Sequence, residues 1–170
     1  MYELIKLLFD ISLFRKGPAD VPHSRVLQKI LIAGFALIRF IMLNMTHDWI
    51  EALYQVGFET AYVLAFCWLL LYFDRKPERF NQVSSAFFGI YALIAFVSLP
   101  AVATAGIGRG GVFVFLIMLV INGWFCAATA HVIYHTLDQR LGLSIGVGLL
   151  FLIGSNLILD LFNSILAGFN

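Results

Sequence analysis

The stretch LQKILIAGFALIRFIMLNM, residues 27–45, decides the fold class of this chain. Its residues are apolar except for Gln28, Lys29, Arg39 and Asn44. About 20 apolar residues, each rising about 1.5 Å along a helix, cross the hydrocarbon layer of a bilayer, which is about 30 Å thick. The stretch therefore predicts a membrane-spanning helix that carries an arginine.

Four further apolar stretches follow, at about residues 52–73, 83–104, 112–134 and 141–162. Of the 170 residues, 61% are hydrophobic and 12% are charged, against about 45–50% and about 25% in ordinary soluble domains. The mean hydropathy of +0.92 agrees with a lipid-embedded chain. We expect an all-α polytopic membrane protein built as a five-helix transmembrane bundle. Pro100 should kink or end the third span near one interface.

The segment before the first span predicts two smaller elements. Residues 1–16 place several apolar side chains on one helical face, which is typical of an amphipathic helix in the membrane interface: Leu4, Leu7, Leu8, Ile11 and Phe14. A helix that docks on a partner would show the same pattern. Gly17, Pro18 and Pro22 then require a turn, and Ser24 is the expected N-cap of the first span. We divide the chain into a helix and elbow, 1–25, and a transmembrane domain, 26–170.

The basic residues predict the orientation. Nine of the eleven Lys and Arg residues lie before the first span, between the second and third, or between the fourth and fifth, which are segments on one side of the membrane. Arg109 lies on the other side, and Arg39 lies within a span. Because basic loops stay in the cytoplasm, we expect a cytoplasmic N-terminus and a periplasmic C-terminus. Six basic residues suit anionic lipid head groups of the cytoplasmic leaflet or a partner: Arg15, Lys16, Arg25, Arg75, Lys76 and Arg79.

The net charge and the cysteines argue against a nucleic-acid partner and against a structural disulfide. The net charge is +1, and the basic residues form no stripe along one element, so we expect no nucleic-acid partner. Cys67 and Cys126 both lie inside apolar runs, where buried thiols are usual and a structural disulfide is not expected.

Polar residues inside the spans form the main candidate site. Arg39, Glu59 and Asp160 fall at a similar depth, and a lone charge near the bilayer centre costs about 2.5–3.5 kcal/mol on insertion scales. Gln55, Glu59 and Tyr62 share one face of the second span, as Asn156, Asp160 and Asn163 do on the fifth, and Asn122 lies in the middle of the fourth. We predict a buried cluster in which Arg39 pairs with Glu59, with Asp160, or with both.

Two interpretations of this cluster stay open. It is either a polar pathway in which a carboxylate changes protonation during transport, or a paired set of charges that fixes the register of the helices. An arginine that extends outward to the interface would also be a structural solution. We favour the structural interpretation, because five helices with short loops leave little room for alternating access and no inverted repeat is visible.

His131, His135 and Asp138 form a second candidate cluster at the cytoplasmic end of the fourth span. Two histidines four residues apart can share a metal ion, but no HExxH motif or nearby cysteine completes a ligand set. We therefore expect interfacial histidines that hydrogen-bond to loops, with no metal and no cofactor. No nucleophile has a base beside it in a catalytic pattern, so we expect that the protein is not an enzyme.

The segment LFRKGPADVPHSRVL, residues 13–27, resembles the opening of small uncharacterised inner-membrane proteins of Gram-negative bacteria, which share an R-x-G-P-x-D-x-P-x-S pattern. The five-helix arrangement with a cytoplasmic N-terminus is similar to the Yip1-like membrane family. This resemblance implies a bacterial inner-membrane protein that acts through partners. We expect a non-enzymatic accessory, scaffold or assembly subunit that binds other membrane proteins or itself. The alternative is a small ion- or proton-coupled transporter or channel centred on Arg39, Glu59 and Asp160.

Overall fold

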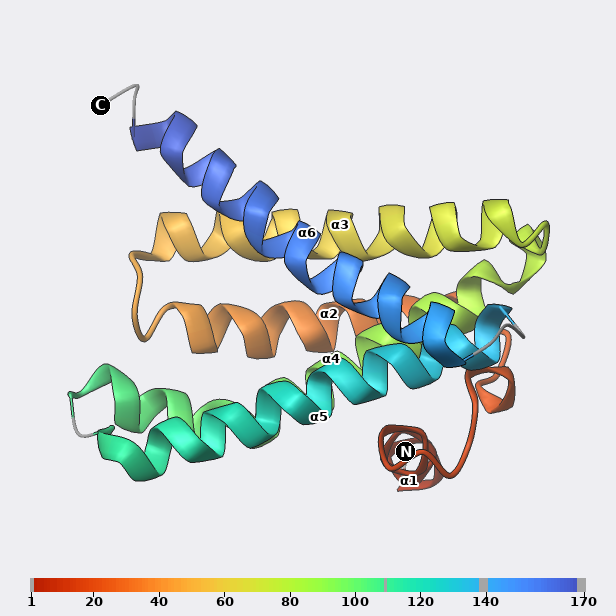
Figure 1. The fold of residues 1–170 in the computed structure, drawn as a ribbon, viewed down its shortest axis with the longest axis horizontal. Coiled ribbons are helices and arrows are strands. Elements are labelled where there is room, and N and C mark those ends of the chain that lie inside the picture. Colours follow the sequence, from red (N-terminus) through yellow and green to blue (C-terminus); the bar gives the residue numbers. More distant parts are fainter. Residues whose placement is uncertain (1, 109, 138–140, 168–170) are drawn as a thin grey trace.

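The computed structural model of the chain describes residues 2–108, 110–137 and 141–167, without the side chains of residues 2, 141, 161–163 and 165–167. In order, the helices are α1 (Tyr2–Ser12), η1 (Pro18–Asp20), α2 (Arg25–Leu43), α3 (Trp49–Phe73), η2 (Pro77–Arg79), α4 (Phe80–Gly106), α5 (Gly111–Leu137) and α6 (Leu141–Ala167). The described part of the chain contains no strand. Five helices are long and apolar enough to cross a membrane (Figure 1). The prediction of an all-helical chain with five spans is confirmed.

The helix boundaries follow local signals in the sequence. The Ser24 side chain accepts a hydrogen bond from the backbone N–H of Leu27 (3.2 Å), which confirms it as the N-cap of α2. Pro100 does not end α4, which continues to Gly106, so of the two predicted effects a kink is the one that remains. The Thr104 hydroxyl donates to the Pro100 carbonyl (2.7 Å) within the same helix.

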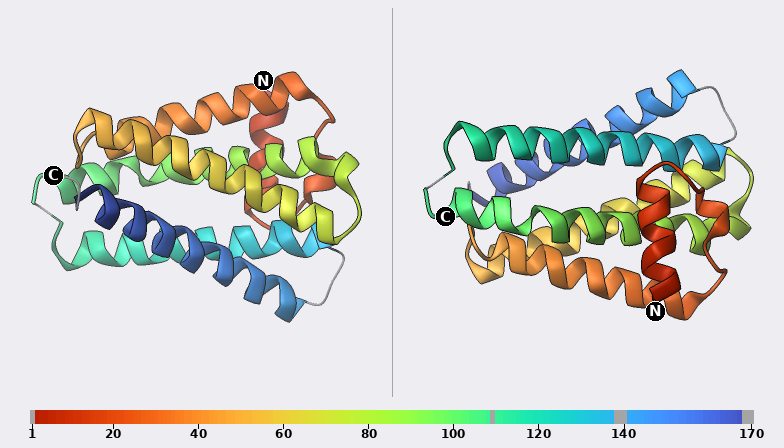
Figure 2. Two further views of the ribbon diagram at one scale, coloured as in Figure 1. Left: turned by 90° about the horizontal axis from the view of Figure 1, so that it is seen from above. Right: turned by 90° about the horizontal axis from the view of Figure 1, so that it is seen from below.

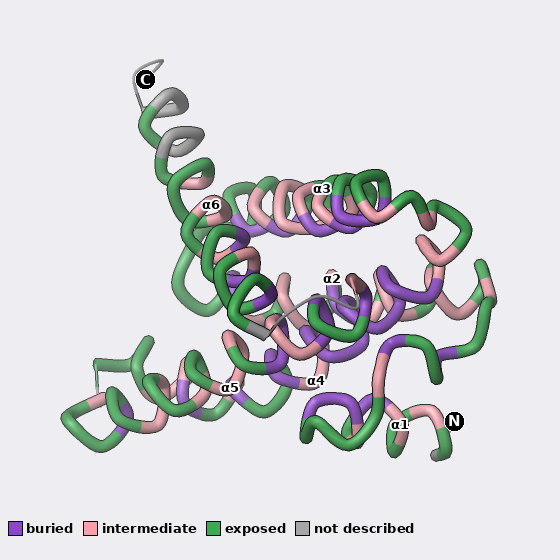
Figure 3. Tube along the Cα trace, turned by 45° about the vertical axis from the view of Figure 1, so that its right-hand side comes forward, coloured by how far each residue is buried: buried purple, intermediate pink, exposed green. Residues whose placement is uncertain are grey.

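Helix α4 is the centre of the bundle. Every residue from 82 to 91 is buried, because α1, α2, α3 and α5 all pack around this helix (Figure 3). Small residues allow the close approach: the hydroxyls of Ser84 and Ser85 bond to carbonyls one turn back in α4, and Gln28 of α2 donates its amide to the Ser84 hydroxyl (2.7 Å). Such internal bonding lets small polar residues lie at helix contacts inside a membrane.

Helix α1 lies across the long helices and not along them (Figure 2). Its Leu8 and Ile11 are buried, and Leu8 fills the space above Gly89 of α4, where any side chain would overlap it. The indole of Trp124 on α5 donates to the Ser12 carbonyl at the end of α1 (2.9 Å). The first helix is therefore docked on α4 and α5.

The elbow between α1 and α2 is held by one side chain of α4. The Gln82 amide nitrogen donates to the carbonyls of Ala19 (2.9 Å) and Val21 (2.8 Å). Within the elbow, the Gly17 N–H donates to the Asp20 carboxylate (3.0 Å). We call the end of the bundle that holds this elbow and η2 the elbow end, and the opposite end, where the turn 44–48 joins α2 to α3, the Thr46 end (Figure 1).

Helix α6 crosses the bundle obliquely, over α3 and α5 (Figure 1, Figure 2). It packs closely at Gly148, where an added Cβ would lie 3.5 Å from the Cα of Ala130 on α5. Towards the Thr46 end it separates from α5, and the large apolar side chains of that half of α5 are exposed, among them Val112, Phe113 and Val120. The crossing angle of α6 determines which of its polar residues can reach the centre of the bundle.

Candidate functional site

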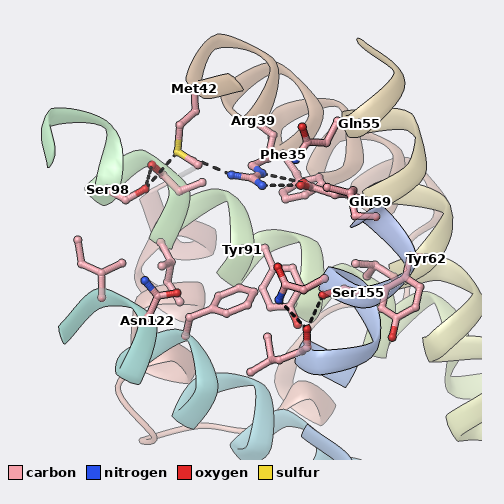
Figure 4. A pocket seen from close by; sticks show the side chains of 18 of the residues that line it. Phe35, Arg39, Met42, Gln55, Glu59, Tyr62, Tyr91, Ser98, Asn122 and Ser155 are labelled. Carbon is pink, nitrogen blue, oxygen red and sulfur yellow. Dashed lines mark hydrogen bonds and ion pairs between the residues drawn. The ribbon is translucent and has the colours of Figure 1, made fainter. Parts of the chain in front are cut away.

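A cavity of about 320 Å³ lies among the five long helices and holds most of the predicted polar cluster (Figure 4). Six of the eight predicted residues line it: Arg39, Gln55, Glu59, Tyr62, Asn122 and Asn156. We call it the polar cavity. It brings together side chains of α2, α3, α5 and α6 that are far apart in the sequence.

Arg39 and Glu59 form a two-point ion pair on one wall of the polar cavity. The Arg39 Nε donates to Glu59 Oε2 (2.7 Å), and its Nη2 donates to Oε1. The exposed fractions of the two side chains are 22% and 18%, so most of the surface of both side chains is buried inside the bundle. Side chains lean towards the N-terminus of their own helix. Because α2 and α3 are antiparallel, Arg39 and Glu59 lean towards each other.

The free side of the Arg39 guanidinium faces a methionine and a serine. Its Nη1 lies 3.9 Å from the Met42 sulfur, and the Ser98 hydroxyl of α4 lies 3.4 Å from the same sulfur. Met42, Ser98 and Ser155 also line the cavity and were not among the predicted residues. Helical spacing carries a signal for Met42, which lies three residues after Arg39 and so on the same face, whereas no signal distinguishes the two serines from ordinary small residues in a span.

Asp160 does not belong to the polar cavity, contrary to the sequence prediction. It is exposed and does not line the cavity. Among the residues that the structure describes, no basic side chain is within ion-pair distance of Asp160. The physical reason is the oblique course of α6, which carries residue 160 away from Arg39 while it leaves Asn156 at the cavity. The Asn163 side chain lies outside the described residues.

Aromatic rings close the polar cavity towards the elbow end. Tyr91 contacts Phe125 (ring centroids 4.5 Å apart) and Phe151 (6.2 Å), and its hydroxyl shares a hydrogen bond with Thr129 (3.1 Å). Beyond Tyr91 along α4 the side chains of Phe87 and Phe88 are fully buried. The cavity therefore has a dense apolar floor towards the elbow end.

The predicted histidine pair lies against the elbow. His131 Nε2 is 2.9 Å from the Lys16 carbonyl oxygen, the rings of His131 and His135 are 4.5 Å apart, and an added Cβ at Gly17 would lie 3.3 Å from the His135 ring. Asp138 lies outside the described residues. Among those that are described, no three side chains of metal-binding type come together. The arrangement joins α5 to the elbow.

The basic residues predicted to meet head groups or a partner gather at the elbow end (Figure 1). Arg15, Lys16, Arg25 and Arg75 are exposed. Lys76 pairs with Asp74 (3.0 Å), and Lys16 lies 4.0 Å from Asp10. The exposed basic side chains leave positive charge at the elbow end that can meet anionic head groups or a partner.

No protein family model, no curated protein and no solved structure matches the chain.

Proposed function

We propose that the protein is a non-enzymatic accessory or assembly subunit of the bacterial inner membrane, with its N-terminus in the cytoplasm. In this proposal the Arg39–Glu59 pair fixes α2 against α3, and the docked N-terminal segment and the outer helix faces bind other membrane proteins. The observation that supports it is the Arg39–Glu59 pair in the polar cavity: the pair is complete, and fully buried Phe87 and Phe88 lie between the cavity and the elbow end. An ion pair with both partners present, next to a dense apolar layer, fits a structural contact between helices better than a pathway for ions or protons.

The N-terminal segment is the proposed contact for a partner. Leu8 and Ile11 face the bundle, whereas Ile5, Phe9, Leu13 and Phe14 are exposed and apolar. Helix α1 would then lie as an amphipathic element near the membrane interface, with a second apolar strip left for lipid or a partner helix. The resemblance of residues 13–27 to small Gram-negative inner-membrane proteins, and of the topology to the Yip1-like family, agrees with this role.

Affinity purification in a mild detergent tests the proposal. We expect the tagged protein to recover partners in fixed stoichiometry, and the double variant Phe9→Ala/Leu13→Ala to lose them without a change in melting temperature, because both side chains are exposed. The comparison variant is Leu143→Ala/Leu150→Ala on α6, which removes two leucines that are more exposed and should reduce the recovery of partners less, because the N-terminal segment is the main contact. A protein that purifies alone and turns over a substrate would refute the proposal.

The second candidate is a small proton- or ion-coupled transporter. The specific observation in its favour is that Arg39 and Glu59 face a cavity large enough for a small solute. Vesicles that contain a pH-sensitive dye separate the two candidates. Flux from the wild type that Glu59→Gln abolishes would favour the transporter, since an amide keeps the shape of the carboxylate but does not exchange a proton. Flux no greater than that of empty vesicles under every imposed gradient would exclude it.

A further inference from the structure

The mouth of the polar cavity lies between α5 and α6, at the depth of the hydrocarbon layer. Asn122 and Asn156 both line the cavity and are both exposed. Each lies roughly 16 Å from the end of its helix at the Thr46 end, at a rise of about 1.5 Å per residue. A bare amide in hydrocarbon costs free energy, so these two side chains mark an opening that a polar group fills.

The hydrogen bonds at this mouth leave oxygen atoms facing the cavity. The amide nitrogen of Asn122 donates to the Met118 carbonyl (2.8 Å), and that of Asn156 donates to the Leu152 carbonyl (2.8 Å). The Ser155 hydroxyl donates to the same Leu152 carbonyl (2.9 Å). One N–H of each amide and the Ser155 O–H are thus used within the helices, while the amide and hydroxyl oxygens remain as acceptors for a group that carries N–H bonds.

The inner wall of the polar cavity offers donors. The Nη1 of Arg39 has only the long contact to the Met42 sulfur (3.9 Å), and the Gln55 amide has no hydrogen-bond partner among the described residues. The charges of Arg39 and Glu59 cancel within the cavity. A ligand with no net charge but with separated positive and negative groups matches this wall, whereas a ligand with a net charge does not.

We propose that the polar cavity binds the zwitterionic head group of a phospholipid that carries a primary ammonium. The phosphate lies towards Arg39 and Gln55, and the ammonium lies towards the free lone pairs of Glu59 and the oxygens at the mouth. Aromatic faces in the wall, such as that of Phe151, add cation–π attraction for the ammonium. The volume of about 320 Å³ falls at the lower end of the range for ligand sites.

The position of the mouth favours a lipid over a soluble zwitterion. A lipid that lies beside α5 and α6 reaches the opening by moving sideways, with its head group entering the cavity. Its acyl chains then lie along exposed apolar residues of these helices, such as Val120 and Leu157. A water-soluble ligand with the same head group would have to cross hydrocarbon to reach the same opening. This proposal goes beyond the accessory function and does not depend on a protein partner.

Native mass spectrometry of the detergent-purified protein tests the proposal with three phospholipids of identical acyl chains. We expect phosphatidylethanolamine to bind about tenfold more tightly than phosphatidylglycerol, because the latter carries a net negative charge and no ammonium. Phosphatidylcholine should bind more weakly than phosphatidylethanolamine, because its ammonium has no N–H to donate. Equal binding of phosphatidylethanolamine and phosphatidylglycerol would overturn the proposal.

Variants locate the site. Asn122→Leu/Asn156→Leu removes the acceptors at the mouth and keeps the apolar surface, so phosphatidylethanolamine binding should fall about tenfold while the melting temperature holds. Leu150→Ala, at an exposed position outside the cavity lining, is the control and should bind as the wild type does. Undiminished binding by the double asparagine variant would overturn the site. Glycerophosphoethanolamine that binds as tightly as the lipid would overturn the lateral entry and assign the cavity to a soluble zwitterion.

Discussion

The hydroxyl of Tyr62 on α3 donates a hydrogen bond to the backbone carbonyl of Phe151 on α6, at 3.0 Å. The two rings also pack against each other, with centroids 5.1 Å apart. A Cβ built on Gly154, one turn further along α6, would lie 2.7 Å from the Tyr62 hydroxyl oxygen. The absence of a side chain at residue 154 therefore lets α6 come close enough to α3 to close one side of the polar cavity.

Substitutions at this contact should loosen α6 to different degrees. Tyr62→Phe removes one hydrogen bond and should lower the free energy of unfolding by about 0.5–1.5 kcal/mol. Gly154→Ala forces the Tyr62 ring to move and should cost about 1–3 kcal/mol, as overpacking does. Thermal unfolding in detergent measures both. Gly57→Ala, where an added Cβ meets nothing within 4 Å, is the control; an equal loss at Gly57 and Gly154 would contradict the contact.

Removing one member of the ion pair should be worse than removing both. Arg39→Ala leaves the Glu59 carboxylate without its partner, which should cost about 3–5 kcal/mol by analogy with other broken buried pairs. Arg39→Met/Glu59→Met removes both charges and keeps similar volume, so it should recover most of this loss. Yield of folded protein and melting temperature measure the difference, and a double variant as unstable as Arg39→Ala would show that the pair itself is not the cause.

Asp160→Asn is the matched test of the corrected cluster. Because Asp160 is exposed and does not line the polar cavity, this change should alter the melting temperature far less than Glu59→Gln, which removes the charge that Arg39 faces. The same thermal measurement decides it. An equal fall in melting temperature for Asp160→Asn and Glu59→Gln would show that Asp160 does belong to the polar cluster.

The spans could be predicted because their signal is local: length and apolar composition suffice to place each helix, and Ser24 and Pro18 mark boundaries by their own chemistry. The Arg39–Glu59 pair could also be predicted, since both charges fall at one depth on neighbouring helices. The prediction for Asp160 was wrong because the depth of a residue within its span does not fix the angle at which that helix crosses the others. Gly148 follows Ser144 by four residues, a spacing that predicts close helix approach but not which helix is approached. Gly154 acts through a contact with α3 that no sequence period reveals.

Gln82 provides a test of how the elbow is held. Gln82→Leu keeps the volume but leaves the Ala19 and Val21 carbonyls without their donor, and should cost about 1–3 kcal/mol. The elbow should then be cut faster by protease, while the long helices stay intact. Asn81→Ala, at the preceding residue of α4, is the control, and equal protection in wild type and Gln82→Leu would show that other contacts hold the elbow.

Fusions to the C-terminus test the proposed orientation. Five spans and a cytoplasmic N-terminus, expected from the excess of basic residues at the elbow end, place the C-terminus in the periplasm. A C-terminal alkaline phosphatase should be active, and a fluorescent protein at the same position should remain dark. The reverse result would show that the orientation or the number of spans is wrong.

The hydrogen bond from Trp124 to the Ser12 carbonyl also sets an order of events during synthesis. Its two residues are 112 positions apart, so at about 5–20 residues per second the ribosome needs roughly 6–22 s to make the second partner after the first. Throughout that interval Leu8 and Ile11 have no complete surface to cover them. The segment that is translated first is therefore among the last to reach its final position, and membrane insertion of α5 is the step that lets it do so.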